Sequence, residues 1–191
     1  MEEIEVKFLE IDHAELQAKL VSLGAEKTGE YFYKVKAYDY SDKRLGKENA
    51  WVRLRGDGTQ VNLCYKQRQG VSADRLRDQG MKEIEVMVDN FEKADQFLAS
   101  VGLIEKFVED KRRIRYMFEG VEIDLDEVPL LPPYLELEGP SWEDLERVAL
   151  MLGLDWAKHL RCSSMQVYEH YGLDENDYSV LTFKEQVKKA L

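Results

Sequence analysis

Charged and apolar residues alternate in four short segments of the chain. Residues 3–7 read Glu-Ile-Glu-Val-Lys, and similar alternation recurs at 53–55, 83–86 and 136–138. This period of two is that of a β-strand. A single segment of this kind is ordinarily a solvated strand face, but such faces usually mix in Thr, Ser and Gln. Here the polar positions are almost purely Glu, Asp, Arg and Lys, which predicts a charged interior.

The acidic positions of this pattern suit divalent cations. Carboxylate oxygens are the ligands that Mg²⁺ and Mn²⁺ prefer. Facing a common interior, they would hold one or two Mg²⁺ or Mn²⁺ ions. The candidate metal ligands are Glu3, Glu5, Asp124, Glu136 and Glu138.

The basic positions suit phosphate oxygens, which Arg binds through forked hydrogen bonds and Lys as a point charge. Several cations beside bound metal fit a substrate with more than one phosphate, such as a triphosphate. Phosphoryl transfer then requires mainly positioning and neutralisation of charge, and no Ser, Cys or His nucleophile. The candidate phosphate ligands are Lys7, Arg53, Arg55, Lys66 and Arg113.

The first half of the chain reads as strands with one helix. Asp12 is positioned to cap a helix over about 13–23. A strand follows at 31–40, and two strands at 50–55 and 60–66 surround a glycine turn, which predicts a hairpin. Residues 67–80 read as a mobile loop carrying further arginines, namely Arg68, Arg75 and Arg77.

The opening of the chain is then repeated. The strands at 3–7 and 83–86 are each followed by a helical segment that ends at a Gly shortly before Glu-Lys. This repetition predicts two related strand–helix–strand halves. A closed or nearly closed antiparallel barrel with helices outside accommodates such halves.

The second half supplies three more strands and the final helices. Strands are expected at 111–115, 121–126 and 134–138. Ser141 is positioned to cap a helix over about 142–152. Further helices are expected around 155–171 and from about 183 to 190.

The composition bounds the class of protein. With 191 residues and 44% hydrophobic residues, the chain is long enough for one substantial domain. A net charge of −11 argues against general nucleic-acid binding. Cys64 and Cys162 lack metal-ligand spacing and read as free thiols. No apolar run has the roughly 20 residues of a membrane span and no targeting signal is evident, so we expect a cytoplasmic protein without membrane partners.

Seven of these motifs occur in an order that resembles the CYTH superfamily, also called triphosphate tunnel metalloenzymes. The resemblance covers about residues 1–170, and Cys64 departs from it by standing where the family often has Thr. The motifs are Glu3-x-Glu5-x-Lys7, Arg53-x-Arg55, Tyr65-Lys66, Glu83-x-Glu85, Lys111-x-Arg113, residues 123–126 and Glu136-x-Glu138.

The resemblance implies an α+β fold, in which an eight-stranded antiparallel β-barrel forms a tunnel within a single domain over 1–191. The tail at 172–191 lies beyond the signature and is expected to be helical. The resemblance also implies divalent-metal-dependent chemistry on triphosphates, with Glu83 positioning the basic residues or water. Lys111 and Arg115 share the face of Arg113 and are alternative phosphate ligands. The implied catalytic set is Glu5, Lys7, Glu83 and Arg113.

Family resemblance leaves the reaction open among inorganic triphosphatase, thiamine triphosphatase and class IV adenylyl cyclase. Hydrolysis of inorganic triphosphate to pyrophosphate and phosphate is favoured, because no added nucleobase-binding motif is seen. A cyclase would need an adenine pocket, for which Tyr31, Tyr33, Tyr38 and Trp51 are available, and a thiamine triphosphatase an aromatic platform. A non-catalytic module that binds polyphosphate is the remaining class, and a homodimer is left open.

Overall fold

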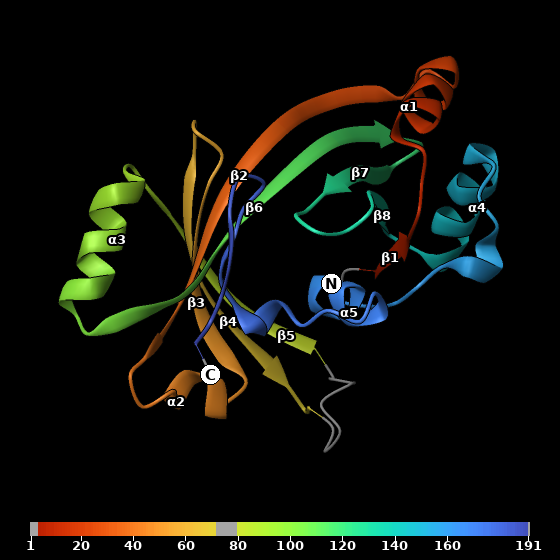
Figure 1. Ribbon diagram of the computed structural model, residues 1–191. Helices are drawn as coiled ribbons and strands as arrows, with labels where there is room; N and C mark the ends of the chain where they lie inside the picture. The colour runs from red at the N-terminus through yellow and green to blue at the C-terminus, as the bar shows by residue number, and fades with distance from the viewer. Residues whose placement is uncertain (1–3, 72–79, 191) are drawn as a thin grey trace. The chain divides into compact units, whose positions relative to one another are not determined.

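The computed structural model describes residues 4–71 and 80–190, and Figure 1 shows its ribbon. Three residues named from the sequence lie outside these ranges: Glu3, Arg75 and Arg77.

Eight main strands form one antiparallel sheet, as the sequence predicted. Their hydrogen-bonded order is β1-β8-β7-β6-β2-β3-β4-β5, and among the described residues no hydrogen bonds join the two ends of this order into a closed barrel. The strands are β1 (Ile4–Phe8), β2 (Glu26–Tyr40), β3 (Ala50–Gly56), β4 (Val61–Gln69), β5 (Gly80–Val88), β6 (Leu103–Phe118), β7 (Val121–Glu127) and β8 (Tyr134–Gly139).

The chain divides into two compact units, each described by itself below. Unit 1 comprises Met1–Tyr31 and Lys111–Glu175, and unit 2 comprises Phe32–Asp110 and Asn176–Leu191. The long strands β2 and β6 contribute residues to both units.

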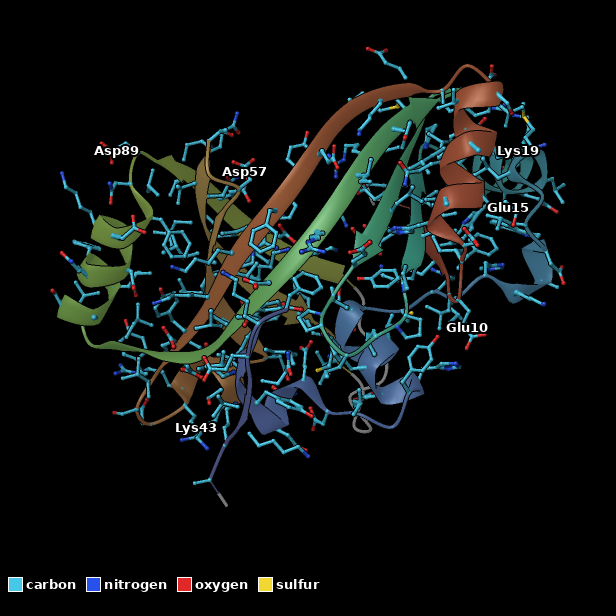
Figure 2. All side chains as sticks on the ribbon, turned by 45° about the horizontal axis from the view of Figure 1, so that its top comes forward. Glu10, Glu15, Lys19, Lys43, Asp57 and Asp89 are labelled. Carbon is cyan, nitrogen blue, oxygen red and sulfur yellow. The ribbon has the colours of Figure 1, made fainter. Side chains whose placement is uncertain are left out.

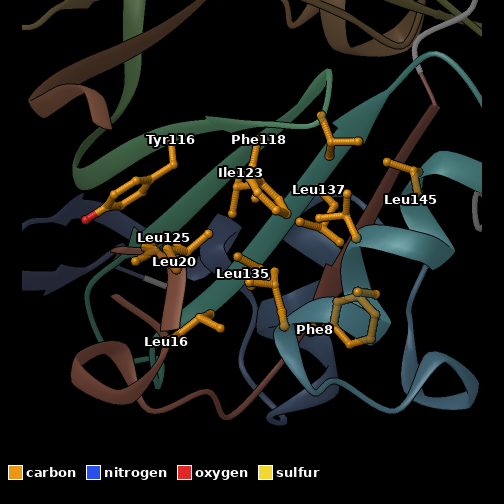
Figure 3. Close-up of a cluster of buried hydrophobic side chains, with 14 of the residues drawn as sticks. Phe8, Leu16, Leu20, Tyr116, Phe118, Ile123, Leu125, Leu135, Leu137 and Leu145 are labelled. Carbon is orange, nitrogen blue, oxygen red and sulfur yellow. The ribbon is translucent and has the colours of Figure 1, made fainter. Parts of the chain in front are cut away.

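Unit 1 has an apolar core on one face of its strands (Figure 3). Two helices, α1 (His13–Ser22) and α4 (Trp142–Leu152), contribute to it. Ile123, Leu125 and Leu137 are fully buried, and burial of each such side chain contributes about 1.5–3 kcal/mol. Because side chains alternate along a strand, the apolar face turns the charged residues between these positions to the other face.

The helices begin where their capping residues predict. The Asp12 side chain accepts a hydrogen bond of 2.9 Å from the Glu15 amide at the start of α1, and Ser141 accepts one of 3.1 Å from the Asp144 amide at the start of α4. Glu15 and Lys19, one turn apart on α1, are exposed (Figure 2). Both expected helices are confirmed.

Unit 2 repeats the opening of the chain with β5, α3 (Phe91–Ser100) and β6, so the predicted pseudo-repeat is confirmed. Phe91 and Leu98 of α3 pack in a second core with Tyr38 and Leu54. A short helix, α2 (Arg44–Lys47), follows β2. The hairpin of β3 and β4 is also confirmed, and Asp57 in its turn (Figure 2) accepts a 2.8 Å hydrogen bond from the Thr59 amide.

The helix expected around 155–171 is wrong as a single helix. The structure has a short 3₁₀ helix, η1 (Trp156–Lys158), and then α5 (Ser164–His170). Between them, Leu160 pairs with Lys7 of β1, and Ser163 caps α5 in a capping box. Between the two helices, the bridge to Lys7 and the cap of α5 therefore take the place of the hydrogen bonds of a continuous helix.

The helical tail expected at 172–191 is also wrong. After a second 3₁₀ helix, η2 (Glu175–Asp177), the chain forms the strands β9 (Tyr178–Leu181) and β10 (Gln186–Lys188). β9 lies parallel to β6, with Val180 opposite Val108, and β10 pairs antiparallel with β9. The partner strand is about 70 residues earlier in the chain, so local sequence patterns did not reveal it.

Part of the segment 67–80, which was expected to be a loop, belongs to strands, because β4 continues to Gln69 and β5 begins at Gly80. Residues 72–79 of that segment lie outside the described ranges. Within the described ranges, no helix has the length and apolar character needed to cross a membrane.

Candidate active site

The charged face of unit 1 is built by the register of β1, β8, β7 and β6. Lys7 lies opposite Glu136, Glu136 opposite Asp124, and Asp124 opposite Arg115. One row across four strands therefore reads cation, carboxylate, carboxylate, cation. Two carboxylates directly opposite each other would repel, and the flanking cations offset this repulsion.

Lys7 is the buried cation at one end of this row, with 2% of its surface exposed. Its ammonium lies 2.9 Å from Glu136 Oε2 and also pairs with Glu5. The amide and carbonyl of Lys7 both bond to Leu160, at 2.8 and 2.9 Å. Lys7 and Glu136 therefore form a non-hydrogen-bonded pair of the β1–β8 ladder, the type in which side chains approach most closely.

Arg113 is the central cation of the charged face. Its Nε and Nη2 each donate a 2.7 Å hydrogen bond to Asp126, in the bidentate geometry that favours Arg. Nη2 also lies 3.2 Å from Glu136 Oε1, and Nη1 pairs with Asp124. Burial opposes the charge on Arg113, but Asp126, Glu136 and Asp124 outweigh it and raise the pKa of this guanidinium well above its ordinary value.

The two central carboxylates have opposite pKa shifts. Burial alone would raise the pKa of Glu136, but the charges of Lys7 and Arg113 outweigh burial and hold its pKa well below the ordinary range. At Asp124 burial is the larger effect and the pKa is raised, although Arg115 and Arg113 oppose the shift. Glu136 is therefore held as the anion, whereas Asp124 is the more readily protonated of the two.

Two further cations complete the basic side of unit 1. Arg115 donates two hydrogen bonds of 2.8 Å to Asp124 and lies 2.6 Å from Glu122. Lys111 lies 2.5 Å from Asp126. The sequence placed Lys111 and Arg115 on the face of Arg113, and this placement is confirmed.

A second row of unit 1 is acidic. Glu5 lies opposite Glu138 on β8, and Glu138 lies opposite Glu122 on β7. Like charges on neighbouring strands disfavour each other, and burial followed by the nearby Asp124 raises the pKa of Glu122. A divalent cation would relieve this repulsion.

The donors of the acidic row have the chemistry of a Mg²⁺ or Mn²⁺ site, since all are carboxylates. As they are placed, Glu5 pairs with Lys7 and Glu122 with Arg115, and no three Asp, Glu, His or Cys residues of the described ranges converge to hold a metal ion. Metal binding would thus require these carboxylates to exchange partners. The further predicted ligand, Glu3, lies outside the described residues.

Unit 2 carries its own charged face on β3, β4 and β5. Arg53 lies 3.5 Å from Glu85, and Lys66 pairs with Glu83. The Nε of Arg53 is buried without a hydrogen-bond partner among the described residues. Burial and then the neighbouring Arg55 lower the pKa of Arg53. An anion would satisfy this donor.

Arg55 lies over the ring of Tyr33, with 4.9 Å from its guanidinium carbon to the ring centroid. Within the described part of the chain it forms no ion pair, in contrast to Arg53 and Lys66. Its guanidinium therefore keeps its hydrogen-bonding capacity for an anion.

The sequence missed three carboxylates of these clusters. Asp126, fully buried and bound to both Arg113 and Lys111, was not assigned a role. Glu122 and Glu85 were likewise left without one. Asp126 and Glu122 share the alternation of Asp124, and that periodicity was the available signal.

The chain belongs to the CYTH domain family, whose pattern matches residues 1–164. Members of this family are enzymes, and their chemistry generally depends on divalent metal ions. The match includes every charged position described above in both units. No curated protein sequence matches the chain.

Solved structures share the fold at low sequence identity. A putative adenylate cyclase from Vibrio parahaemolyticus is 16% identical, with 88% of this chain and 98% of that chain covered and a TM-score of 0.67. The putative adenylyl cyclase HpAC1 from Hippeastrum, described as having a dominant triphosphatase activity, is 16% identical, with coverage of 93% and 99% and a TM-score of 0.65. The PH1819 protein from Pyrococcus horikoshii OT3 is 24% identical, with coverage of 88% and 99% and a TM-score of 0.65.

Proposed function

We propose that this protein is a divalent-metal-dependent phosphohydrolase that cleaves inorganic triphosphate to pyrophosphate and phosphate. The observation that carries the proposal is the register of unit 1, which sets the acidic row of Glu5, Glu138 and Glu122 beside the buried cations Lys7 and Arg113. Hard carboxylate ligands next to fixed cations are what a metal-bound polyphosphate requires.

The buried cations of unit 1 are held in position before a ligand binds. Lys7 and Arg113 are held in place by carboxylates on neighbouring strands, and phosphate oxygens would replace some of these contacts as the carboxylates exchange partners. Preorganised cations of this kind stabilise charge on a transferring phosphoryl group. We assign phosphate binding in unit 1 to Lys7, Lys111, Arg113 and Arg115.

The basic residues of unit 2 support binding of further phosphate oxygens. Arg53 has a buried donor without a partner among the described residues, and Arg55 forms no ion pair there. Lys66 is paired with Glu83, which fits the expected role of Glu83 in positioning a basic residue. We assign phosphate binding in unit 2 to Arg53, Arg55 and Lys66.

Mg²⁺ or Mn²⁺, when bound, would neutralise phosphate charge and lower the pKa of a coordinated water. The proposed ligands are Glu5, Glu122, Asp124, Glu136 and Glu138, all within the described residues, together with Glu3, which lies outside them. Of these, Glu136 is already ionised, since Lys7 and Arg113 lower its pKa. It therefore needs no proton loss on metal binding.

Hydrolysis is favoured over cyclisation of ATP by the state of the aromatic residues. Tyr38 is 1% exposed and its hydroxyl donates a 2.8 Å hydrogen bond to Asp95, so it belongs to the core of unit 2. Tyr33 lies beneath Arg55, and Tyr31 lies 6.0 Å from the Arg115 guanidinium. Three of the four candidate platforms for adenine are thus engaged with other side chains.

Class IV adenylyl cyclase remains the second candidate because cyclase-like structures share the fold.

The test is a side-by-side assay of tripolyphosphate, ATP and thiamine triphosphate with Mg²⁺, with Mn²⁺ and with EDTA. Phosphate and pyrophosphate release are measured for each, and cyclic AMP is measured in the ATP reactions. We expect metal-dependent cleavage of tripolyphosphate with little turnover of ATP. Cyclic AMP as the main product of the ATP reaction would overturn the hydrolase proposal and identify a cyclase. Binding of tripolyphosphate without turnover of any substrate would identify a binding module instead.

A further inference from the structure

The outer edge of β1 is held at one position. On its inner side β1 pairs with β8, and on its outer side the described residues make one bridge, in which Lys7 and Leu160 exchange hydrogen bonds of 2.8 and 2.9 Å. The bridged residue is the one whose ammonium lies between Glu5 and Glu136. An edge strand without such a bridge exposes its backbone to solvent and frays more readily.

Leu160 lies in a segment without regular structure, so its position depends on its neighbours. On one side, the ring of His159 stacks on Trp156 with a centroid distance of 4.3 Å and an interplanar angle of 25°. His159 Nδ1 also lies 2.7 Å from the Trp156 carbonyl oxygen. On the other side, the Arg161 guanidinium lies 4.6 Å from the ring centroid of Trp142.

Trp142 and Trp156 connect this segment to regular structure. Trp142 is the first residue of α4, close after the end of β8. Trp156 lies in η1, and its ring centroid is 6.2 Å from that of Phe8, the residue after Lys7. His159 also approaches Trp142, at 6.4 Å. We name the set of Trp142, Trp156, His159 and Arg161 the aromatic clamp.

We propose that the aromatic clamp positions Lys7 for phosphate binding by holding Leu160 against the outer edge of β1. The inference rests on the proposed function, in which Lys7 binds a phosphate of the substrate. His159 and Arg161 are positioning residues, because their contacts run to Trp156 and Trp142 and their effect on the ligand passes through the Lys7 backbone. Unlike a catalytic group, each would lose its importance once the Lys7 ammonium is removed.

The physical reason lies in the geometry of the β1–β8 pair. Both backbone polar groups of Lys7 point to Leu160, and its side chain stands across from Glu136 in the close type of pair. Loss of the outer bridge leaves these two groups to solvent and lets the strand twist, which displaces the ammonium. A small displacement of a phosphate-binding charge weakens its contribution steeply.

The experiment compares His159→Ala and Arg161→Ala with His159→Phe, which keeps a ring on Trp156. Arg44→Ala is the matched control, since the guanidinium carbon of Arg44 lies 3.8 Å from the ring centroid of Tyr40, and Arg44 also pairs with Asp42, both in unit 2. Amide hydrogen exchange at Lys7 and Leu160 is measured by NMR. Affinity for tripolyphosphate with Mg²⁺ is measured by calorimetry, in the wild-type background and in Lys7→Met.

We expect both alanine variants to speed exchange at Lys7 and Leu160 and to weaken tripolyphosphate binding about two- to fivefold, the size of one cation–π or stacking contact. His159→Phe should restore most of the affinity, and Arg44→Ala should match the wild type. In the Lys7→Met background the clamp substitutions should cause no further loss.

Faster exchange with unchanged affinity would overturn the positioning role, and so would an equal loss of affinity in the Lys7→Met background. Unchanged exchange in both alanine variants would show that the clamp does not hold the bridge. If the wild-type protein binds no tripolyphosphate, the proposed function fails, while the exchange rates still decide whether the clamp closes the edge of β1. Thermal unfolding of each variant confirms that the fold is retained.

Discussion

Lys7 and Glu136 meet across the β1–β8 ladder with 2.9 Å between Nζ and Oε2, and both residues are buried. Each is tied to further charges, Lys7 to Glu5 and Glu136 to Arg113. The pair therefore joins the acidic and basic parts of the unit 1 cluster. Its behaviour on titration and substitution reports on the whole charged face.

Ionisation of the Glu136 carboxylate should contribute to the pH dependence of the free energy of unfolding. Its pKa is lowered from an ordinary value of 4.5, so its ionised form stabilises the folded state above that value, and this stabilisation is lost as pH falls from 4.5 through the folded pKa. Glu136→Gln lacks this titration and leaves Lys7 and Arg113 with less compensation. We expect the variant to be less stable than the wild type at pH 7. The difference in their free energies of unfolding should narrow toward pH 3.

Urea unfolding of the wild type and Glu136→Gln across that range checks this prediction. A difference in free energy of unfolding that stays constant from pH 7 to pH 3 would contradict the prediction.

Asp126 should be a major contributor to the stability of unit 1. Asp126→Asn removes the anion that binds Arg113 and Lys111, and it leaves the buried Arg113 and the partly buried Lys111 without this partner. Breaking a buried pair in this way costs about 3–5 kcal/mol, measured as the free energy of unfolding in urea. Arg147→Ala breaks exposed ion pairs with Glu119 and Asp144 and serves as the control. Similar losses in the two variants would rule out a special role for Asp126.

Arg55→Ala should weaken binding of tripolyphosphate about 10- to 100-fold, the range for loss of a hydrogen bond to a charged group. The matched control is Arg44→Ala, in which an arginine over a tyrosine is removed from the same unit. Calorimetric titration with tripolyphosphate and Mg²⁺ measures both. Equal effects would mean that net charge in general, and not the position of Arg55, governs binding.

The acidic row should determine the concentration of Mg²⁺ or Mn²⁺ that cleavage requires. Glu138→Gln and Glu122→Gln each remove one carboxylate of the row, and we expect the Mg²⁺ or Mn²⁺ concentration for half-maximal cleavage of tripolyphosphate to rise about tenfold or more. The control is Glu146→Gln on the exposed face of α4. If Glu122→Gln behaves like the control while Glu138→Gln does not, Glu122 is excluded from the metal site and serves Arg115 alone.

Local patterns in the sequence determined the secondary structure near the site. The alternation of Glu5 and Lys7 with Val6 specified which side chains of β1 face the core, since the period of a strand is two. Asp12 and Ser141 marked the starts of α1 and α4, because capping depends on residues within one turn. The ordered charged motifs also identified the family, which the match over 1–164 confirms.

Only the tertiary structure decided which charges meet. Arg113 binds Asp126 and Arg115 binds Asp124 because the β6–β7 register places them opposite each other, and a slip of one residue would turn every side chain to the other face. Three features depend on partners elsewhere in the chain: the pairing of Asp126 with Arg113, the bridge from Leu160 to Lys7 and the strands of the tail. Such contacts form only when the backbone brings remote segments together, so no local period in the sequence encodes them.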